Sequence, residues 1–395
     1  MDIKPYQKRT WAEIDLNAVE HNYKEIKKCV KNAKVCCVIK ANGYGHGALE
    51  LARCYEKFGA DFFAVSNIEE AIQLRQGGID TPILVLGYTE PTCAKILAEY
   101  SISQCVFSSE YGKSLVYHCT KDRVKVKVHI KIDTGMGRIG FKFGHETTDD
   151  LQDAIEICKS ECFILEGIFT HFASADEGKK GDRYTRYQFQ NFIAAINIFK
   201  SKGIQFEIRH CANSAAIVEY PYMHLDMVRA GIVLYGVHPS QVTKNKLNLM
   251  PVMKVKTVID YIKIVEKKTC ISYGRKFKAR KTTKIATLPI GYADGFWRAN
   301  GLNRACVEIG GEYAPIIGRV CMDQCMVDVT NVGAAVESSV VTVYGAFGKN
   351  SVDAIASKND TINYEILCAV GNRVPRIYFK NGKIVSVTDN IVTKI

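Results

Sequence analysis

Residues 35–47 read VCCVIKANGYGHG, an apolar run that ends on one lysine and is followed by three closely spaced glycines. The apolar run predicts a buried strand, and Lys40 stands at its carboxyl end. The glycines predict a loop, after which a helical pattern begins at Ala48. This arrangement can present an amine at the edge of a sheet. The alternative interpretation is a surface lysine beside a flexible turn, and the rest of the chain decides between the two.

Strand-like runs alternate with helical patterns as far as Ala230. The runs are Cys36–Lys40, Phe62–Ser66, Ile83–Gly87, Ser103–Phe107, Val126–Asp133, Glu166–His171, Phe206–Cys211 and Leu225–Ala230. Asn67 and Glu70 resemble a capping box for one helix, and Asn17 is the expected cap of the first helix. Eight strands alternating with helices favour a (β/α)8 barrel, because that number closes the sheet. The alternative is an open doubly wound sheet, but no GxGxxG motif follows the first strand.

The pattern changes after about Met250, where short strands separated by glycines and charged residues dominate. The predicted strands are Val255–Val265, Lys284–Pro289, Arg304–Ile309, Ala314–Ile317, Val327–Val329 and Val340–Tyr344, with helical stretches at Ser351–Ser357 and near Tyr364–Ala369. A chain of 395 residues is also too long for one ordinary core. We therefore predict an α/β chain of two domains, with a TIM-like (β/α)8 barrel over residues 1–242 and a mostly β domain over residues 243–395.

The composition is that of an ordinary globular protein with a basic excess. The net charge is +12, but the lysines are spread along the chain and no basic stretch alternates with aromatic residues, so nucleic acid is not an expected partner. No apolar run reaches the length of a transmembrane helix, and the N-terminus lacks the apolar segment of a signal peptide. The fifteen cysteines are scattered without zinc-like spacing. We expect a cytoplasmic protein with free thiols, no membrane partner and no metal site.

Polar residues end or follow several of the predicted barrel strands. In chain order they are Lys40, Lys131, Asp133, Arg138, His171, His210, Asn213, Ser214, Arg229 and the pair Gly231-Ile232. In a (β/α)8 barrel the carboxyl ends of the strands meet at one mouth, where reactive groups gather. A lone histidine there would mean little, but lysines and arginines beside a small Ser/Gly cradle suit an anionic cofactor. A lysine that forms imines next to a phosphate-binding nest indicates pyridoxal phosphate.

The same residues stand in motifs that resemble those of the alanine racemases, and the resemblance covers almost the whole chain. The motifs are VIKANGYGHG at 38–47, KIDTGMGRIG at 131–140, THFA at 170–173, HCANSAA at 210–216, VRAGI at 228–232, ISYG at 271–274, GYADG at 291–295, GRVCMDQ at 318–324 and NYE at 363–365. The lysine motif alone does not separate this family from related barrel proteins that bind the same cofactor. The motifs of the second domain do.

The resemblance implies an enzyme that depends on pyridoxal 5'-phosphate, which Lys40 would hold covalently. The implied cofactor-binding residues are Lys40, Tyr44, Arg138, His171, Asn213, Ser214, Arg229, Gly231, Ile232 and Tyr364. Arg229 would face the pyridine nitrogen, oriented by His171. Because an arginine does not give up its proton, the ring nitrogen would stay largely unprotonated and transamination would be suppressed. A lysine at the Lys131 position is often carbamylated in the family.

The implied reaction interconverts L-alanine and D-alanine, supplying D-alanine for peptidoglycan. Racemisation needs one base on each face of the α-carbon. Lys40 would serve one face, and Tyr273, reaching in from the partner subunit of a head-to-tail homodimer, would serve the other. A tyrosine with a pKa of about 10 is a poor base, so neighbouring cations should lower it. The implied substrate-binding residues are Arg138, Tyr292, Met322 and Asp323.

Three alternatives stay open at the level of sequence. The nearest is a racemase of the same mechanism that prefers serine or another amino acid, although Tyr364 favours alanine. A pyridoxal-phosphate carrier without turnover is disfavoured by the second domain, and a decarboxylase of the same fold is disfavoured by the motifs around Tyr273 and Met322. Trp297 stands where relatives usually carry proline, near the substrate entrance, and could narrow it.

Overall fold

The chain forms two compact units, and each is described by itself. The computed structural model describes residues 8–144, 150–241 and 246–392. The first, called the barrel unit, comprises Glu20–Gly43 and Ala48–Leu249. The second, called the β unit, comprises the chain up to Val19, the short segment Tyr44–Gly47 and the chain from Met250 onward. The predicted boundary between residues 242 and 243 lies outside the described residues, so it stays a prediction.

The barrel unit contains a parallel sheet built from strands in the eight predicted places. They are β2 (Lys34–Val38), β3 (Phe62–Val65), β4 (Ile83–Val85), β5 (Ile102–Val106), β6 (Val126–Asp133), β8 (Phe163–Phe169), β9 (Ile208–His210) and β10 (Met227–Ala230), hydrogen-bonded in the order β10-β2-β3-β4-β5-β6-β8-β9. The short β7 (Phe141–Lys142) pairs beside β6. Two backbone hydrogen bonds bring the ends of this order together, from Asp226 to Arg209 at 3.1 Å and from Arg229 to Ala212 at 2.9 Å. The predicted (β/α)8 barrel is therefore confirmed.

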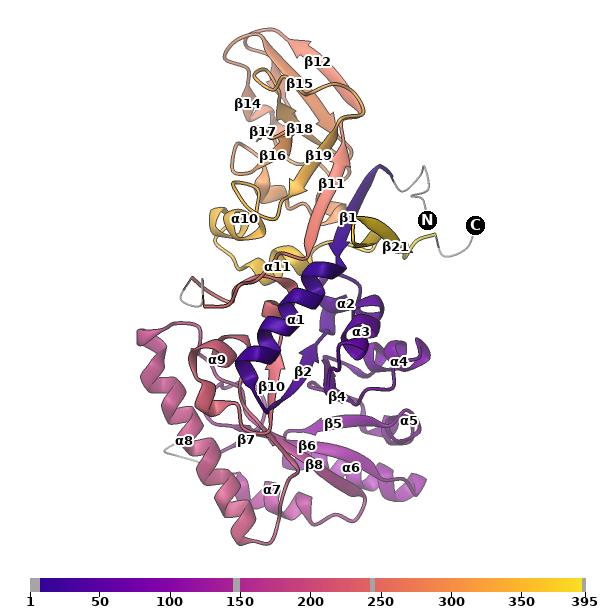
Figure 1. Cartoon of the computed structure of the whole chain (residues 1–395), viewed down its shortest axis with the longest axis vertical. Helices are drawn as coiled ribbons and strands as arrows, with labels where there is room; N and C mark the ends of the chain where they lie inside the picture. Colours follow the sequence, from indigo (N-terminus) through magenta and orange to yellow (C-terminus); the bar gives the residue numbers. More distant parts are fainter. Residues whose placement is uncertain (1–7, 145–149, 242–245, 393–395) are drawn as a thin grey trace. The chain divides into compact units, whose positions relative to one another are not determined.

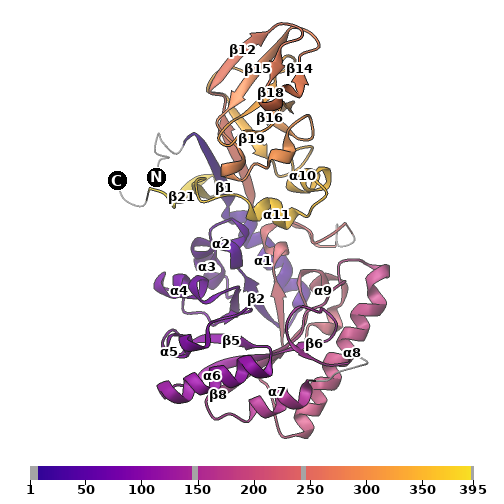
Figure 2. The same cartoon turned by 180° about the vertical axis from the view of Figure 1, so that it is seen from behind.

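Helices lie on the outside of these strands (Figures 1 and 2). They are α1 (Leu16–Val30), α3 (Ala48–Lys57), α4 (Ile68–Gln76), α5 (Ala94–Glu99), α6 (Ser109–Asp122), α7 (Leu151–Cys158), α8 (Lys179–Ser201) and α9 (Ser214–Glu219). Asn67 caps α4 as predicted, because its side chain accepts a hydrogen bond from the backbone of Glu70. The Glu70 half of the predicted capping box differs, since its carboxylate accepts from the backbones of Ser66 and Ala41. The predicted cap of α1 is wrong. Asp15, one residue before the helix begins, accepts from the backbone of Asn17 at 2.8 Å and of Ala18 at 3.3 Å. No helix within the described ranges combines the length and apolar character needed to cross a membrane.

The β unit is built on a ten-stranded sheet in the order β12-β15-β18-β17-β16-β19-β11-β1-β20-β21. The strands are β1 (Thr10–Asp15), β11 (Met253–Val258), β12 (Tyr261–Val265), β15 (Thr283–Leu288), β16 (Cys306–Ile309), β17 (Glu312–Ile317), β18 (Cys325–Asp328), β19 (Val340–Tyr344), β20 (Arg376–Lys380) and β21 (Lys383–Thr388). A small hairpin, β13 (Cys270–Ile271) with β14 (Phe277–Lys278), and the helices α10 (Val352–Lys358) and α11 (Asn363–Cys368) complete it. The predicted mostly β character is confirmed.

The first strand of the chain belongs to this sheet rather than to the barrel. β1 pairs antiparallel with β11, Thr10 facing Thr257, and parallel with β20, Ala12 facing Arg376. The hydroxyls of Thr10 and Thr257 lie 3.0 Å apart in a buried hydrogen bond. Because β1 fills the gap between two strands of the C-terminal sheet, it is part of that core.

Candidate active site

Lys40 opens a tight left-handed turn at the end of the first barrel strand. α2 (Lys40–Tyr44) is no ordinary helix, since Ala41, Asn42 and Gly43 have φ values of 52°, 52° and 62°. A side chain in this conformation costs roughly 1–2 kcal/mol per residue, so the turn is held by other contacts. The carboxylate of Glu70 accepts from the backbone of Ala41 at 2.7 Å, and the side chain of Asn42 accepts from Ala48 at 3.0 Å. These contacts fix the backbone from which the Lys40 side chain leaves.

His171, after β8, is surrounded by positive charge. Its Nδ1 lies 3.2 Å from Nη2 of Arg229. Burial, followed by the charges of Arg229, Arg138, Lys131 and Lys40, holds the pKa of His171 well below its usual value. The imidazole is therefore neutral at physiological pH. Because a guanidinium only donates hydrogen bonds, Nδ1 of His171 is the acceptor in this contact.

Lys131 lies on β6 with its side chain buried against an aromatic ring. Only 3% of the residue is exposed, and its amine lies 5.3 Å from the centre of the Phe169 ring. Burial lowers the pKa of Lys131 to about 8, and the charges of Arg138 and Arg229 act in the same direction. A substantial fraction of this amine is therefore neutral near physiological pH, which is the form that reacts with carbon dioxide. That chemistry agrees with the predicted carbamylation.

The loop that carries Arg138 is shaped by the last residue of β6. The carboxylate of Asp133 accepts three backbone hydrogen bonds, from Gly135 at 2.9 Å, Met136 at 2.8 Å and Gly137 at 3.1 Å. These bonds fold the chain back immediately before Arg138, whose side chain is exposed. The KIDTGMGR motif thus encodes a strand, a carboxylate that organises the turn, and an arginine presented by that turn.

Arg229, on β10, is 3% exposed and makes five hydrogen-bonding contacts. Nη1 reaches the ring and the carbonyl of His210 at 2.9 and 3.2 Å. Nη2 reaches the carbonyls of Thr170 and Cys211 at 2.8 and 3.1 Å, in addition to the His171 ring. Burial lowers the pKa of Arg229 to about 10, so the guanidinium stays charged at neutral pH. These partners fix the orientation of both Nη groups.

The interior of the barrel contains a polar chain behind Arg229 that sequence reasoning missed. The His210 ring lies 2.9 Å from His129, which lies 3.0 Å from the carboxylate of Glu166; Ser103 donates to the same carboxylate. Gly167 makes room for this chain, since a Cβ there would lie 2.3 Å from Nδ1 of His129. The available signal was a polar residue at alternate positions of an otherwise apolar strand, as in VKVHIKID.

Ser214 and Gly231 are brought together by a hydrogen bond. The hydroxyl of Ser214 accepts from the backbone of Gly231 at 2.9 Å. Ile232 follows at the start of the single turn η4 (Ile232–Tyr235) and is buried. The side chain of Asn213 caps α9 by accepting from Ala216 at 3.0 Å, so its carbonyl oxygen already has a structural partner. The Ser214 hydroxyl, together with Arg229 and the other positive side chains that lower the pKa of His171, has the chemistry to bind an anionic cofactor such as pyridoxal phosphate.

Tyr44 and Tyr364 lie in the β unit and contact each other, with ring centres 6.0 Å apart. Burial raises the pKa of Tyr44, so its phenol is a neutral donor. The segment that carries Tyr44 is held by β20. Arg376 donates to the carbonyl of Gly45 at 2.9 Å, and Tyr378 donates to that of His46 at 3.0 Å.

Three further predicted residues form an exposed rim of the β unit, defined here as Tyr273, Tyr292 and Met322. They are 68%, 43% and 53% exposed. Their loops are tied to one another. Tyr292 donates its backbone N–H to the carbonyl of Cys321 at 3.1 Å, and Ser272, beside Tyr273, donates its hydroxyl to the carbonyl of Arg319 at 2.7 Å. Large side chains exposed on adjoining loops are typical of a surface that another molecule covers.

Asp323, next to Met322, is fixed by an arginine. Arg373 binds Asp323 at 2.8 Å and Asp294 at 3.5 Å, and the side chain of Asp294 is fully buried. Asp294 also accepts from the backbone of Gly291 at 3.0 Å, immediately before Tyr292. A chain of ion pairs therefore joins the loop of Tyr292 to the loop of Met322.

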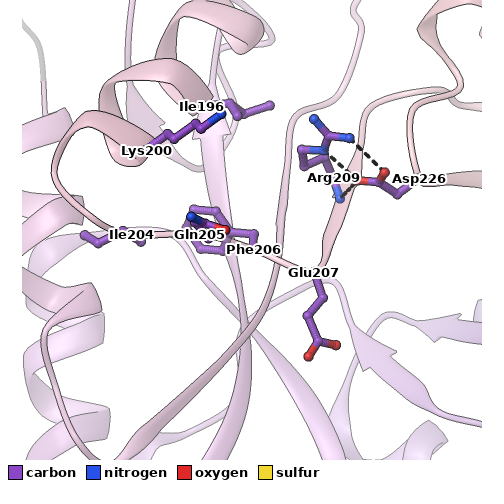
Figure 3. A pocket seen from close by; sticks show the side chains of 8 residues that line it. All are labelled: Ile196, Lys200, Ile204, Gln205, Phe206, Glu207, Arg209 and Asp226. Atoms are coloured by element: carbon purple, nitrogen blue, oxygen red, sulfur yellow. Dashed lines mark hydrogen bonds and ion pairs between the residues drawn. The ribbon is translucent and has the colours of Figure 1, made fainter.

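A pocket in the barrel unit lies away from the predicted residues (Figure 3). It is lined by Ile196, Lys200, Ile204, Gln205, Phe206, Glu207, Arg209 and Asp226. Arg209 and Asp226 form a two-pronged ion pair of 2.6 and 2.9 Å across it, drawn as dashed lines in Figure 3. These residues lie where β9 and β10 begin, the end of a barrel associated with stability rather than catalysis. The pair joins the two strands that close the barrel.

Comparisons with known proteins cover nearly the whole chain. Two family models match, the N-terminal domain of alanine racemase over residues 14–239 and its C-terminal domain over residues 252–378. The chain is 43% identical to alanine racemase 1 of Clostridium acetobutylicum over 384 residues, covering 96% of this chain and 98% of the relative. It is 44% identical to the alanine racemase of Methanococcus maripaludis over 373 residues, covering 93% and 98%.

Solved structures agree with these relatives. The alanine racemase of Clostridium difficile 630 superposes with a TM-score of 0.91 at 41% identity, covering 97% of this chain and 99% of that one. The alanine racemase of Bacillus anthracis with bound L-Ala-P superposes with a TM-score of 0.90 at 34% identity, covering 98% and 99%.

Proposed function

The chain belongs to the alanine racemase family, and from that premise we propose that Lys40 and Tyr273 are the two bases of its reaction. It is a pyridoxal-phosphate-dependent racemase that interconverts L-alanine and D-alanine, the latter a building block of peptidoglycan. The observation that carries the assignment of the site is the contact between Arg229 and His171 at 3.2 Å, at a place where the charges of Arg138, Lys131 and Lys40 also lower the pKa of His171.

The cofactor, when bound, withdraws electrons from the substrate and so acidifies the proton on its α-carbon. Lys40 would hold it covalently, and Arg229 would face its ring nitrogen. The phosphate would be held by Tyr44, Asn213, Ser214, Gly231, Ile232 and Tyr364. Support comes from the Ser214 hydroxyl, which Gly231 orients by donating to its oxygen, and from the Tyr44 phenol, whose raised pKa keeps it protonated.

Arg229 would contribute a fixed positive charge rather than a transferable proton. Five contacts leave the guanidinium little freedom, and its pKa of about 10 keeps it protonated at neutral pH. His171, which accepts a hydrogen bond from Arg229, would hold the orientation of that group. Because Arg229 would not transfer its proton to the ring nitrogen, the cofactor would withdraw electrons less strongly. That favours proton exchange at the α-carbon over transamination.

Proton transfer would be divided between two side chains. The Lys40 amine would remove or deliver the proton on one face of the α-carbon, and the Tyr273 hydroxyl would do so on the other. Arg138, Tyr292, Met322 and Asp323 would orient the substrate. The support for the last three is the network that joins the loops of Tyr292 and Met322 through Arg373.

Tyr273 would serve the active site of a second copy of the chain in a head-to-tail homodimer. The support is the exposed rim, where Tyr273, Tyr292 and Met322 are 43–68% exposed on one chain alone. A partner that covers them would bury a large aromatic area. The proposed compartment is the cytoplasm, because cysteines that form no disulfide, among them buried Cys36, Cys37 and Cys105, suit a reducing environment.

A chiral assay over a panel of L-amino acids, including alanine and serine, tests the proposed reaction. We expect D-alanine to form fastest. A Lys40→Ala variant should lose both turnover and the absorbance band of lysine-bound pyridoxal phosphate. A faster reaction with serine would overturn the substrate assignment, and an absorbance band that persists in Lys40→Ala would overturn the covalent role of Lys40.

A further inference from the structure

Gln188, on α8, uses both ends of its side-chain amide to hold the loop that carries His171. The residue is fully buried. Its Oε1 accepts from the backbone of Ala173 at 2.9 Å, and its Nε2 donates to the carbonyl of His171 at 3.1 Å. One buried side chain therefore replaces the backbone hydrogen bonds that this loop, lying beyond the end of β8, no longer obtains from the sheet.

Tyr184, one helical turn earlier on the same helix, holds the loop that carries Arg138. Its hydroxyl donates to the carbonyl of Gly135 at 2.8 Å. Gly135 has φ +128°, and a Cβ there would lie 2.3 Å from the Tyr184 hydroxyl and 3.6 Å from Cγ of Gln188. The close approach requires glycine at this position and places the side chains of Tyr184 and Gln188 against one loop.

The two loops are also joined to each other at their origins. The hydroxyls of Thr134 and Thr170 lie 2.8 Å apart in a buried hydrogen bond between the ends of β6 and β8. Residues four apart on a helix lie on the same face, so Tyr184 and Gln188 form one surface under both loops. The contacts of α8 thus converge on the two segments that place Arg138 and His171.

We propose that Gln188 and Tyr184 are positioning residues for the racemase reaction, Gln188 acting through His171 and Tyr184 through the loop of Arg138. The proposal rests on the function proposed above, because it assigns to α8 the placement of two residues given roles there. The contact between His171 and Arg229, at 3.2 Å, depends on where the backbone of His171 lies. A shift of about 1 Å in such a group can cost about 100-fold in rate.

The main test compares Gln188→Met with Gln188→Glu in the cofactor-loaded enzyme. Methionine matches the length of glutamine but forms neither hydrogen bond, whereas glutamate keeps the acceptor for Ala173 and loses the donor to His171. We expect kcat to fall by about 10–100-fold in Gln188→Met and less in Gln188→Glu, with KM little changed. Gln190→Met, the same change at an exposed site two residues away, is the matched control and should leave kcat unchanged.

A double-mutant cycle with His171→Ala separates this proposal from the function on which it rests. If Gln188 acts through His171, adding Gln188→Met to His171→Ala should cost no further activity. Additive losses, or a Gln188→Met enzyme with unchanged kcat, would overturn the positioning role. Full activity in His171→Ala alone would instead overturn the role proposed for His171.

A second readout does not depend on turnover. Amide hydrogen exchange at Ala173 and the affinity of the apoenzyme for pyridoxal phosphate are measured for the same variants. We expect faster exchange at Ala173 and weaker cofactor binding in Gln188→Met, but not in Gln190→Met. Should Gln188→Met fail to fold, Tyr184→Phe tests the same proposal at a surface position. Unchanged kcat and cofactor affinity in Tyr184→Phe would refute the proposal that α8 positions the loops of Arg138 and His171.

Discussion

His210 Nε2 lies 2.9 Å from Nδ1 of His129 in the interior of the barrel, and this contact has a fixed direction. The Arg229 guanidinium can only donate, so Nδ1 of His210, 2.9 Å away, must accept. His210 then carries its proton on Nε2 and donates it to His129, which donates from Nε2 to Glu166 at 3.0 Å. Two neutral imidazoles, those of His210 and His129, thus connect the buried cation of Arg229 to the carboxylate of Glu166.

Replacing Glu166 by glutamine should weaken these buried hydrogen bonds and lower the stability of the fold. Burial alone would raise the pKa of Glu166, but the hydrogen bonds from His129 and Ser103 and the charge of Lys127 lower it from 4.5 to about 2. The carboxylate therefore stabilises the fold above pH 4.5, and the contribution is lost as the pH falls towards 2. We expect Glu166→Gln to lower the free energy of unfolding at pH 7 by about 2–4 kcal/mol, measured by urea denaturation.

Lys127 provides the control for that experiment. It binds Glu166 at 3.3 Å, but its side chain is 43% exposed, so Lys127→Met should cost less than about 1 kcal/mol. The acid-dependent loss of stability between pH 4.5 and 2 should also shrink in Glu166→Gln and persist in Lys127→Met. Equal losses of stability in the two variants would show that the buried hydrogen bonds of Glu166 do not stabilise the fold more than its exposed ion pair with Lys127.

Ala41→Gly should stabilise the turn after Lys40 rather than loosen it. Ala41 has φ 52°, where an L-residue with a Cβ is strained and glycine is not. Removing the methyl group relieves this strain and should raise the free energy of unfolding by up to about 1 kcal/mol. The greater conformational entropy of glycine in the unfolded chain offsets part of that gain. Gly43→Ala, at φ +62° in the same turn, is the opposite change and should destabilise. Thermal unfolding of the two variants measures both signs, and a destabilised Ala41→Gly would contradict the left-handed turn.

Lys131 should take up carbon dioxide in the folded protein. Carbamylation needs the neutral amine, and the pKa of about 8 makes that form abundant at a pH where an exposed lysine is almost fully protonated. Incubation with ¹³C-bicarbonate at pH 8 should give a carbamate signal by NMR that strengthens as the pH rises through 8. The signal should be absent in Lys131→Gln and in urea-unfolded protein. A labelled signal of equal strength in Lys131→Gln would assign it to another amine.

Much of this fold could be predicted because its signals are local. Several barrel strands, among them β2, β3 and β4, are short apolar runs buried on both faces, so they are recognisable without their neighbours, and Lys40 could be placed at the end of β2. The position of β1 could not be predicted in this way. Its partner strand β11 pairs Thr10 with Thr257, and nothing within residues 10–15 distinguishes that sheet from the barrel.

The residues of the candidate site also fall into those that could be predicted from the sequence and those that could not. Residues at strand ends, such as Arg229 and His171, could be placed because the barrel rule brings strand ends together. His129 and Glu166 point into the barrel from mid-strand, where a polar residue facing inward looks the same in sequence as one facing solvent. Gln188 was missed for a related reason, since its role depends on a loop that lies 15 residues away in the chain.

An assay of mixed subunits tests directly whether each active site takes Lys40 from one chain and Tyr273 from another. Homodimers of Lys40→Ala and of Tyr273→Phe should each be nearly inactive. After the two are dissociated, mixed in equal amounts and reassembled, half of the dimers carry one copy of each chain, and each of these has one intact site. We expect recovery of about a quarter of the wild-type racemase activity. Activity that stays at the level of the separate homodimers would contradict it, because both bases would then belong to the same chain.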